Sequence, residues 1–229
     1  MSPSRRTFST KQQLADALAA VVASDLAAGI AARGAASLAV SGGTTPVMFF
    51  AALAQHADVD WGKVIVTLVD ERWVDESSDR SNARLVRQHL LQDSAAAARF
   101  VPLYQGGDTP DAEKAGAAQA DVPRPFDAVI LGMGNDGHTA SFFPGGDTLD
   151  EALTATEPVV AIRAPGAGEP RVTLTLSQLL EARALYLHIE GEGKLATLEQ
   201  AEAEGPVEDM PVRAILRETQ TPLTIYWCP

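Results

Sequence analysis

The sequence has 229 residues, 46% hydrophobic and 21% charged, so the chain can bury a sizeable core and is long for one domain but short for two. Its formal net charge of −12 disfavours surfaces for nucleic acid or anionic membranes, so any anion site must be a local basic pocket. The lone cysteine, Cys228, excludes a disulfide within the chain and is typical of a reducing compartment.

The N-terminal segment carries Arg5 and Arg6 but lacks the apolar stretch of a signal peptide. No uninterrupted apolar run approaches the ~18 residues of a membrane span. We therefore expect a cytoplasmic protein that binds a small molecule, without nucleic acid or membrane partners, as a monomer or a small homo-oligomer.

Helical and strand-like patterns alternate along the chain. Leu14, Leu18 and Leu26 recur at helical spacing over residues 10–33, and Gly34 ends this pattern. Apolar runs typical of strands follow at residues 36–41, 64–71, 100–104, 127–134, 158–165, 171–176, 184–190 and 223–228. Further helical patterns lie at residues 45–57, 81–92, 110–121, 177–184, 193–205 and 211–219. The alternation predicts an α/β fold, one domain over residues 1–229, with a doubly wound, mainly parallel sheet and helices on both faces.

The loops that follow the strands are where chemistry is expected, because ligands bind beyond the carboxyl ends of the strands in such sheets. One connection, residues 163–168, is rich in Gly and Pro and is the best candidate for a mobile flap or a change of direction. A small lobe or flap is accordingly expected around residues 158–176.

The first of these loops, residues 41–46, reads SGGTTP. Gly42 and Gly43 allow the main chain to approach a ligand, and Thr44 or Thr45 can cap the following helix. The N–H groups from Ser41 to Thr44 would then lie at the positive end of a helix, which suits a phosphate. No Lys-Ser or Lys-Thr pair follows, so this is not a Walker loop, and a capped turn without a ligand is the alternative interpretation.

The second loop places Asp70, Glu71 and Arg72 at the end of an apolar run. Packing explains acidic residues there poorly, since a buried charge needs a partner. Arg72 either pairs with these carboxylates or faces an anionic ligand. Ser81 and Asn82 are predicted to cap the next helix.

The third loop contains Gly132, Gly134 and Gly137 in the pattern G-x-G-x-x-G. A dinucleotide site would also need an acidic residue at the end of the next strand, and that run ends in proline, so we reject it. His138 follows directly, and Asp136 lies two residues before it. A histidine at the end of a strand, among glycines and close to a separate anion-site candidate, is a candidate general base.

Other chemistries are less well supported. A metal site is disfavoured because no second histidine follows His138 at the spacing of one helical turn. The other histidines, His56, His89 and His188, fall within helix or strand patterns and are interpreted as structural. No G-x-S-x-G elbow surrounds Ser41 or Ser141, so water is the better nucleophile.

Taken together, these loops resemble the 6-phosphogluconolactonase family, within the superfamily that also includes glucosamine-6-phosphate deaminase. The matching segments are SGGTTP at 41–46, DERWV at 70–74, SNARLVR at 81–87, GMGNDGHTASFFPG at 132–145, RVTLTL at 171–176 and Lys194 in GEGKLATL. The resemblance implies a fold like the deaminase and ribose-5-phosphate isomerase group. It also implies hydrolysis of 6-phospho-D-glucono-1,5-lactone to 6-phospho-D-gluconate in the oxidative pentose phosphate pathway, with no cofactor. Asn135 departs from the acid that many relatives carry and leaves the Asp-Gly-His unit intact.

Hydrolysis of a lactone requires a base for water, donors for the oxyanion and an acid for the departing ring oxygen. Neutral His138 fits the base and its imidazolium fits the acid. Asp136 could orient the ring, and Asp70 could order water or a sugar hydroxyl. The phosphate is expected on the amides of residues 41–44 with help from three cations, Arg72, Arg171 and Lys194. Which cation faces the lactone carbonyl instead is left open.

Two other functions compete with this interpretation. In the deaminase pattern, a glutamate directly before the proline serves ring opening, and the corresponding residue here is Phe143, before Pro144. A non-catalytic sugar-phosphate sensor on the same fold would have no need of His138, and no helix-turn-helix or basic segment is attached. The sequence therefore favours the lactonase.

Overall fold

The computed structural model describes residues 3–218, 220–221 and 223–229. The main sheet is formed by β1 (Ser4–Thr7), β2 (Ala36–Val40), β3 (Val64–Leu68), β5 (Arg99–Val101), β6 (Ala128–Leu131), β9 (Leu185–Glu190) and β10 (Leu223–Cys228). A small sheet is formed by β4 (Asp70–Arg72), β7 (Val159–Ile162) and β8 (Arg171–Leu174). The α-helices are α1 (Lys11–Arg33), α2 (Val47–Ala54), α3 (Asn82–His89), α4 (Ala112–Ala118), α5 (Leu149–Thr154), α6 (Leu176–Leu180), α7 (Glu192–Glu202) and α8 (Arg213–Leu216), and the 3₁₀ helices are η1 (Trp61–Lys63) and η2 (Asp93–Ala97).

The main sheet is parallel throughout the described residues. Its strand order is β1-β10-β9-β6-β2-β3-β5, and each neighbouring pair runs in the same direction. Every residue of β2 and β6 is buried, as expected for parallel strands with helices on both faces. The predicted α/β fold with a mainly parallel sheet is therefore confirmed.

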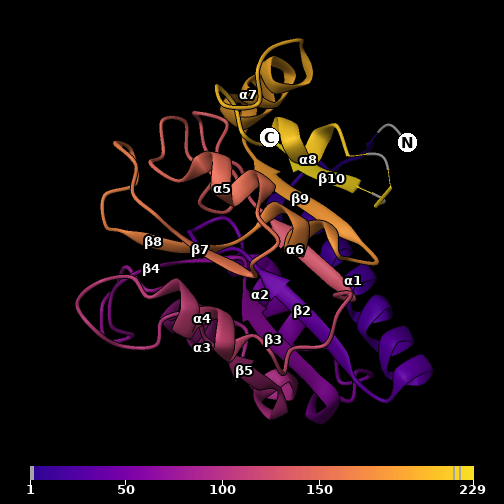
Figure 1. The fold of residues 1–229 in the computed structure, drawn as a ribbon. Helices are drawn as coiled ribbons and strands as arrows, with labels where there is room; N and C mark the ends of the chain where they lie inside the picture. Colours follow the sequence, from indigo (N-terminus) through magenta and orange to yellow (C-terminus); the bar gives the residue numbers. More distant parts are fainter. Residues whose placement is uncertain (1–2, 219, 222) are drawn as a thin grey trace.

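The small sheet lies beside the main sheet (Figure 1), and its order is β4-β8-β7 with antiparallel pairings. The chain passes from the main sheet into the small sheet after β3, and a single residue, Val69, connects β3 to β4. The segment expected to form a lobe or flap, residues 158–176, contributes β7 and β8 to this sheet. Motion of that segment stays a prediction.

The chain reverses its direction of winding in the middle of the main sheet. It passes from β2 through α2 to β3 in one direction, and from β6 to β9 in the other. Because such crossovers are right-handed, the two directions place their helices on opposite faces. Accordingly α1, α2 and α3 pack in succession on one face. The crossovers that contain α6 and α7 run in the other direction, and right-handed winding puts them on the opposite face. The point of reversal lies between the neighbours β2 and β6, and open sheets bind ligands outside the carboxyl ends of the strands at such a point.

The opening helix begins and ends as predicted. The Thr10 hydroxyl accepts a hydrogen bond from the Gln13 N–H at 3.2 Å, and Gly34 takes the left-handed φ of 81° that ends α1. Among the described residues, α1 is the one helix that is long and apolar enough to cross a membrane, with a mean hydropathy of 1.7. A core helix has the same composition, and α1 buries Leu14, Leu18 and Leu26 against the fold.

Among the described strands and α-helices, two elements were not predicted, and neither 3₁₀ helix was. β1 is an edge strand of four exposed residues, SRRT, which has no apolar pattern. α5 is a short helix in the connection between β6 and β7. The helix predicted over residues 211–219 is observed as α8, and Thr219 lies outside the described residues.

Candidate active site

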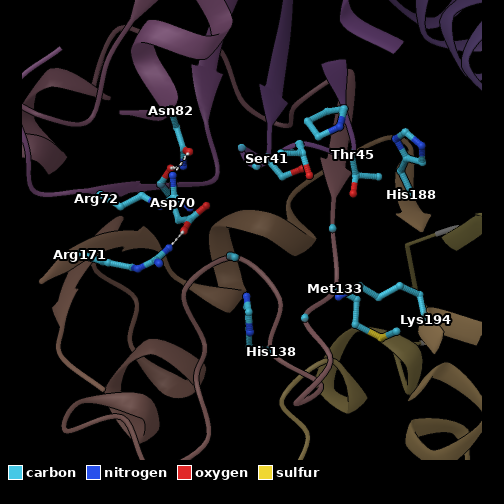
Figure 2. A pocket seen from close by; sticks show the side chains of 17 residues that line it. Ser41, Thr45, Asp70, Arg72, Asn82, Met133, His138, Arg171, His188 and Lys194 are labelled. Atoms are coloured by element: carbon cyan, nitrogen blue, oxygen red, sulfur yellow. Dashed lines mark hydrogen bonds and ion pairs between the residues drawn. The ribbon is translucent and has the colours of Figure 1, made fainter. Parts of the chain in front are cut away.

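A cavity of about 290 Å³ lies at the predicted point, between the loops that follow β2 and β6. Its volume is near the lower end of the range for small-molecule sites. Figure 2 shows Asp70, Arg72 and Arg171 on one side, His188 and Lys194 on the other, and His138 between them. The full lining is Ser41, Gly42, Gly43, Thr44, Thr45, Pro46, Asp70, Arg72, Asn82, Gly132, Met133, Gly134, His138, Ala140, Arg171, His188 and Lys194.

His138 is paired with Asp136. Its Nδ1 atom lies 2.6 Å from Asp136 Oδ1, and its main-chain N–H donates to the same oxygen at 3.1 Å. Partial burial alone would raise the pKa of Asp136, but the hydrogen bonds and charge of His138 outweigh it and lower the pKa to about 2. The carboxylate is therefore ionised and can only accept, so Nδ1 carries the proton and Nε2 of the neutral ring holds the lone pair.

The loop glycines make this pair possible. A Cβ atom on Gly134 would lie 2.1 Å from His138 Nδ1 and 2.5 Å from Asp136 Oδ1. Gly137 has a φ of 77°, a conformation that favours glycine, and its N–H donates to the Gly134 carbonyl at 3.2 Å. The glycines of this loop therefore serve the close approach of a histidine and an aspartate rather than a nucleotide.

Phe143 packs against His138, the candidate general base. Its ring stacks on the His138 imidazole, with centroids 4.1 Å apart and an interplanar angle of 30°. The guanidinium carbon of Arg171 lies 4.9 Å from the centroid of the same phenyl ring. Through these two contacts the buried Phe143 ring connects His138 to Arg171 of the small sheet.

The pairing of β4 with β8 brings two cations together. Its register places Arg72 directly opposite Arg171, and like charges in this position repel each other. Burial lowers the pKa of Arg72, and the nearby charge of Arg171 lowers it further. An anion bound between the guanidinium groups would relieve this repulsion.

Asp70 is held within this basic region. Its Oδ2 atom accepts hydrogen bonds from the Ser141 hydroxyl and, at 3.4 Å, from Arg171 Nη1. Arg171 Nη2 donates to the Ala167 carbonyl at 2.9 Å. Both Asp70 and Arg171 are buried, so the acid predicted at the strand end has the cationic partner that its burial requires.

Asn82 was predicted as a helix cap, but its side chain lines the cavity. Its Nδ2 donates to the main-chain carbonyl of Asp70 at 3.0 Å, and its Oδ1 accepts from Arg72 Nη1 at 3.1 Å. A Cβ atom on Gly42 would lie 1.9 Å from Asn82 Oδ1, so only glycine allows this loop to approach the amide. The cap of α3 is Ser81 alone.

Glu71 organises the segment beneath the site. The buried carboxylate accepts from the main-chain N–H groups of Arg72, Asn82 and Ala83 at 2.8, 2.8 and 2.7 Å, and from the Ser81 hydroxyl at 3.2 Å. Burial raises the pKa of Glu71 to about 7 against these hydrogen bonds. Glu71 thereby fixes both Arg72 and the start of α3.

The loop after β2 offers free main-chain donors. Within the described part of the chain, the N–H groups of residues 42–45 have no hydrogen-bond acceptor. The predicted side-chain cap is wrong, because Pro46 is the N-cap of α2 and the start of the helix has no side-chain cap; Thr44 contributes its main-chain carbonyl, which accepts from the Val47 N–H at 3.5 Å. Lys194, near the start of α7, lines the same cavity; burial lowers its pKa and the Asp136 carboxylate raises it.

The structure thus brings nearly all the predicted site residues to one cavity: Ser41, Gly42, Gly43, Thr44, Asp70, Arg72, His138, Arg171 and Lys194 line it, and Asp136 lies behind His138. Sequence reasoning missed Asn82 and His188. The position of His188, two residues before Glu190 at the carboxyl end of β9, was the signal that could have found it. In the described residues, no group of three or more acidic, His or Cys side chains could hold a metal ion.

Comparison with known proteins gives concordant results. The family model for glucosamine-6-phosphate isomerases/6-phosphogluconolactonase matches residues 9–227. A 6-phosphogluconolactonase of Rhizobium meliloti is 56% identical over 233 aligned positions, covering 100% of both chains. The crystal structure of a 6-phosphogluconolactonase from Shewanella baltica has a TM-score of 0.95 at 43% identity, covering 99% of this chain and 98% of that one. A monomeric glucosamine-6-phosphate deaminase shares the fold, with a TM-score of 0.77 at 16% identity over 98% of this chain and 97% of that one.

Proposed function

Because this chain belongs to the glucosamine-6-phosphate isomerase/6-phosphogluconolactonase family, we propose that it hydrolyses 6-phospho-D-glucono-1,5-lactone to 6-phospho-D-gluconate. The reaction belongs to the oxidative pentose phosphate pathway. The observation that carries the proposal is the His138–Asp136 pair on the wall of a cavity whose other walls supply cations and free main-chain amides.

His138 is the general base and then the general acid. With Nδ1–H donated to Asp136, Nε2 takes a proton from water as the water oxygen bonds to the lactone carbonyl carbon. The tetrahedral intermediate collapses, the bond between that carbon and the ring oxygen breaks, and the imidazolium returns the proton to the departing oxygen. The product carboxylic acid then releases a proton to solvent.

The negative charges of the substrate have matching donors. In the portion of the chain that the structure describes, the buried Nε atoms of Arg72 and Arg171 have no hydrogen-bond partner. The Ser41 N–H donates to the Ile130 carbonyl at 3.0 Å, so the free amides of residues 42–45, rather than 41–44, hold the phosphoryl group and the developing oxyanion together with these guanidinium groups and Lys194. Asp70, beside Arg171, orders water or a sugar hydroxyl.

Deamination of an amino-sugar phosphate is disfavoured by Phe143. Ring opening of a pyranose and proton movement between C1 and C2 need an additional acid or base. Phe143 stacks on His138 where the deaminase pattern has its glutamate, and a phenyl ring moves no proton. Lactone hydrolysis needs no such group, because the ring opens as the intermediate collapses.

A pH-stat assay on freshly generated 6-phosphogluconolactone tests the proposal. Acid release should exceed the spontaneous rate of a blank without enzyme, in proportion to enzyme concentration. Glucono-1,5-lactone, which has no phosphoryl group, should have a lower kcat/KM, because it cannot make the contacts between that group and the cationic side chains. Acid release equal to the blank at high enzyme concentration would refute the proposal.

A further inference from the structure

His188 is a buried histidine with one nitrogen unused. It lies on β9 with only 2% of its surface exposed, and it lines the cavity. Its Nε2 atom lies 3.1 Å from Glu190 Oε1, whereas Nδ1 has no partner among the described residues. Buried polar atoms are nearly always satisfied, so an unpartnered nitrogen at a cavity wall points to a ligand group.

The contact with Glu190 decides which ring nitrogen of His188 donates a hydrogen bond. Burial would raise the pKa of Glu190, but hydrogen bonds from His188 and Lys11 prevail and lower it. The carboxylate is therefore ionised, with Lys11 Nζ at 3.0 Å, so Nε2 of His188 must be a donor. On the neighbouring strand β10, Tyr226 is the register partner of His188 and Cys228 that of Glu190, and burial raises the pKa of Cys228 so that the thiol is neutral. Lys194 lies on the same cavity wall.

The position of His188 in the cavity indicates which part of the substrate would contact it: the phosphoryl group. The His188 ring contacts the Phe49 ring edge-on, with the two ring centroids 6.2 Å apart. Phe49 is in the first turn of α2, so His188 lies close to the start of that helix and to the free amides of residues 42–45. Figure 2 shows His188 near Thr45, on the same side as Lys194 and across the cavity from Asp70. The wall that holds His188 therefore combines a helix N-terminus with a cation, which suits a phosphoryl group.

We propose that His188 is a binding residue for the substrate phosphoryl group, donating a hydrogen bond from Nδ1 while Glu190 holds Nε2. This inference rests on the proposed function. Phosphate monoesters lose their second proton near pH ~6, so the Nδ1 proton comes from solvent or from the monoanionic phosphoryl group itself. The imidazolium then lies between two negative groups, Glu190 and the phosphoryl oxygens.

Two amide variants separate the two ring nitrogens. In His188→Gln the amide can reach the position of Nε2 and keep the Glu190 contact, but the donor at Nδ1 is lost. In His188→Asn the amide occupies the position of Nδ1 and the Glu190 contact is lost. His56→Gln is the matched control, because His56 bonds to Asp58 outside the cavity.

We expect His188→Gln to raise the KM for 6-phosphogluconolactone and the Kd of 6-phosphogluconate about tenfold, the effect of one lost charge-assisted hydrogen bond. The kcat should change much less, and kcat/KM for unphosphorylated gluconolactone should be unchanged. His188→Asn should lose less affinity, and His56→Gln none. Equal losses for both lactones, or wild-type affinity in His188→Gln, would overturn the proposal.

Nitrogen NMR of the wild-type protein gives a readout independent of turnover and of variant folding. The sequence has 4 histidines, so ¹⁵N-histidine labelling resolves the ring nitrogens. Titration with inorganic phosphate should move the Nδ1 resonance of His188 toward the protonated form. A resonance that does not respond at saturating phosphate would contradict the proposal. Should the lactone not be turned over while this shift occurs, the phosphoryl site stands and the lactonase assignment fails.

Discussion

His138 and Phe143 stack nearly face to face, with ring centroids 4.1 Å apart. The contact fixes the plane of the imidazole, while Asp136 fixes its tautomer through Nδ1. Phe143 also occupies the sequence position directly before Pro144, where the deaminase pattern has its glutamate. In the proposed mechanism His138 is the base of hydrolysis, and Phe143 supplies no second acid or base for deamination.

Replacing His138 with alanine should lower kcat roughly 10²–10⁴-fold, the usual contribution of a general base. The His138 side chain is partly exposed, so the fold should persist. Stopped-flow or pH-stat kinetics and circular dichroism check this. His56→Ala serves as the control, and a His138→Ala variant within twofold of wild type in kcat would show that the ring is structural.

Asp136→Asn should lower kcat by about 10²-fold or more, because an amide no longer enforces the Nδ1–H tautomer. The pKa of Asp136, about 2, is below its ordinary value of 3.8, so the carboxylate stabilises the fold above that value and loses the effect as the pH falls through 2. Its charge is thus constant over the assay range. The pH profile of wild-type kcat should show no ionisation of this carboxyl between pH ~4 and ~6, and an ionisation there that Asp136→Asn abolishes would contradict the assignment.

Gly134→Ala should lower kcat by about 10²-fold with little loss of stability, because the added methyl group would displace the His138–Asp136 pair. The control is Gly62→Ala, where the nearest atom to the new Cβ is at an ordinary 3.6 Å. Steady-state kinetics and thermal unfolding of both variants measure the effect. Wild-type kcat in Gly134→Ala would show that the geometry of this pair is not needed.

Lys194→Ala should raise the KM for the phosphorylated lactone about tenfold or more and leave kinetics on unphosphorylated gluconolactone nearly unchanged. Among the described residues Lys194 has no ion-pair partner, so its removal leaves no buried acid uncompensated. Arg171→Ala is a poorer test, because it removes the ion-pair partner of the buried Asp70 and can therefore disturb the site in a second way. Equal effects of Lys194→Ala on the two lactones would remove Lys194 from the phosphoryl site.

The sequence was sufficient to predict the parallel sheet and most residues of the cavity, because polar and charged residues at the carboxyl ends of parallel strands converge on one edge of the sheet. Ser41, His138 and Lys194 all follow strands of the main sheet, so their meeting required no knowledge of side-chain packing. β1 was missed because an exposed SRRT strand carries no hydrophobic period.

The small sheet could not be predicted from periodicity alone. β3 and β4 form one apolar run in the sequence, and only the antiparallel pairing with β8 turns Asp70 and Arg72 toward Arg171. Asn82 was missed for a related reason. A residue in the first turn of a helix is read as a cap, and its contact with Gly42 depends on how α3 packs against the loop after β2.

The most direct test of the central claim measures two products with one enzyme preparation: acid release from 6-phosphogluconolactone and ammonia release from glucosamine 6-phosphate. With Phe143 against His138, we predict lactone hydrolysis well above the spontaneous rate and no ammonia above the blank. Ammonia release at a rate comparable to lactone turnover would contradict the account.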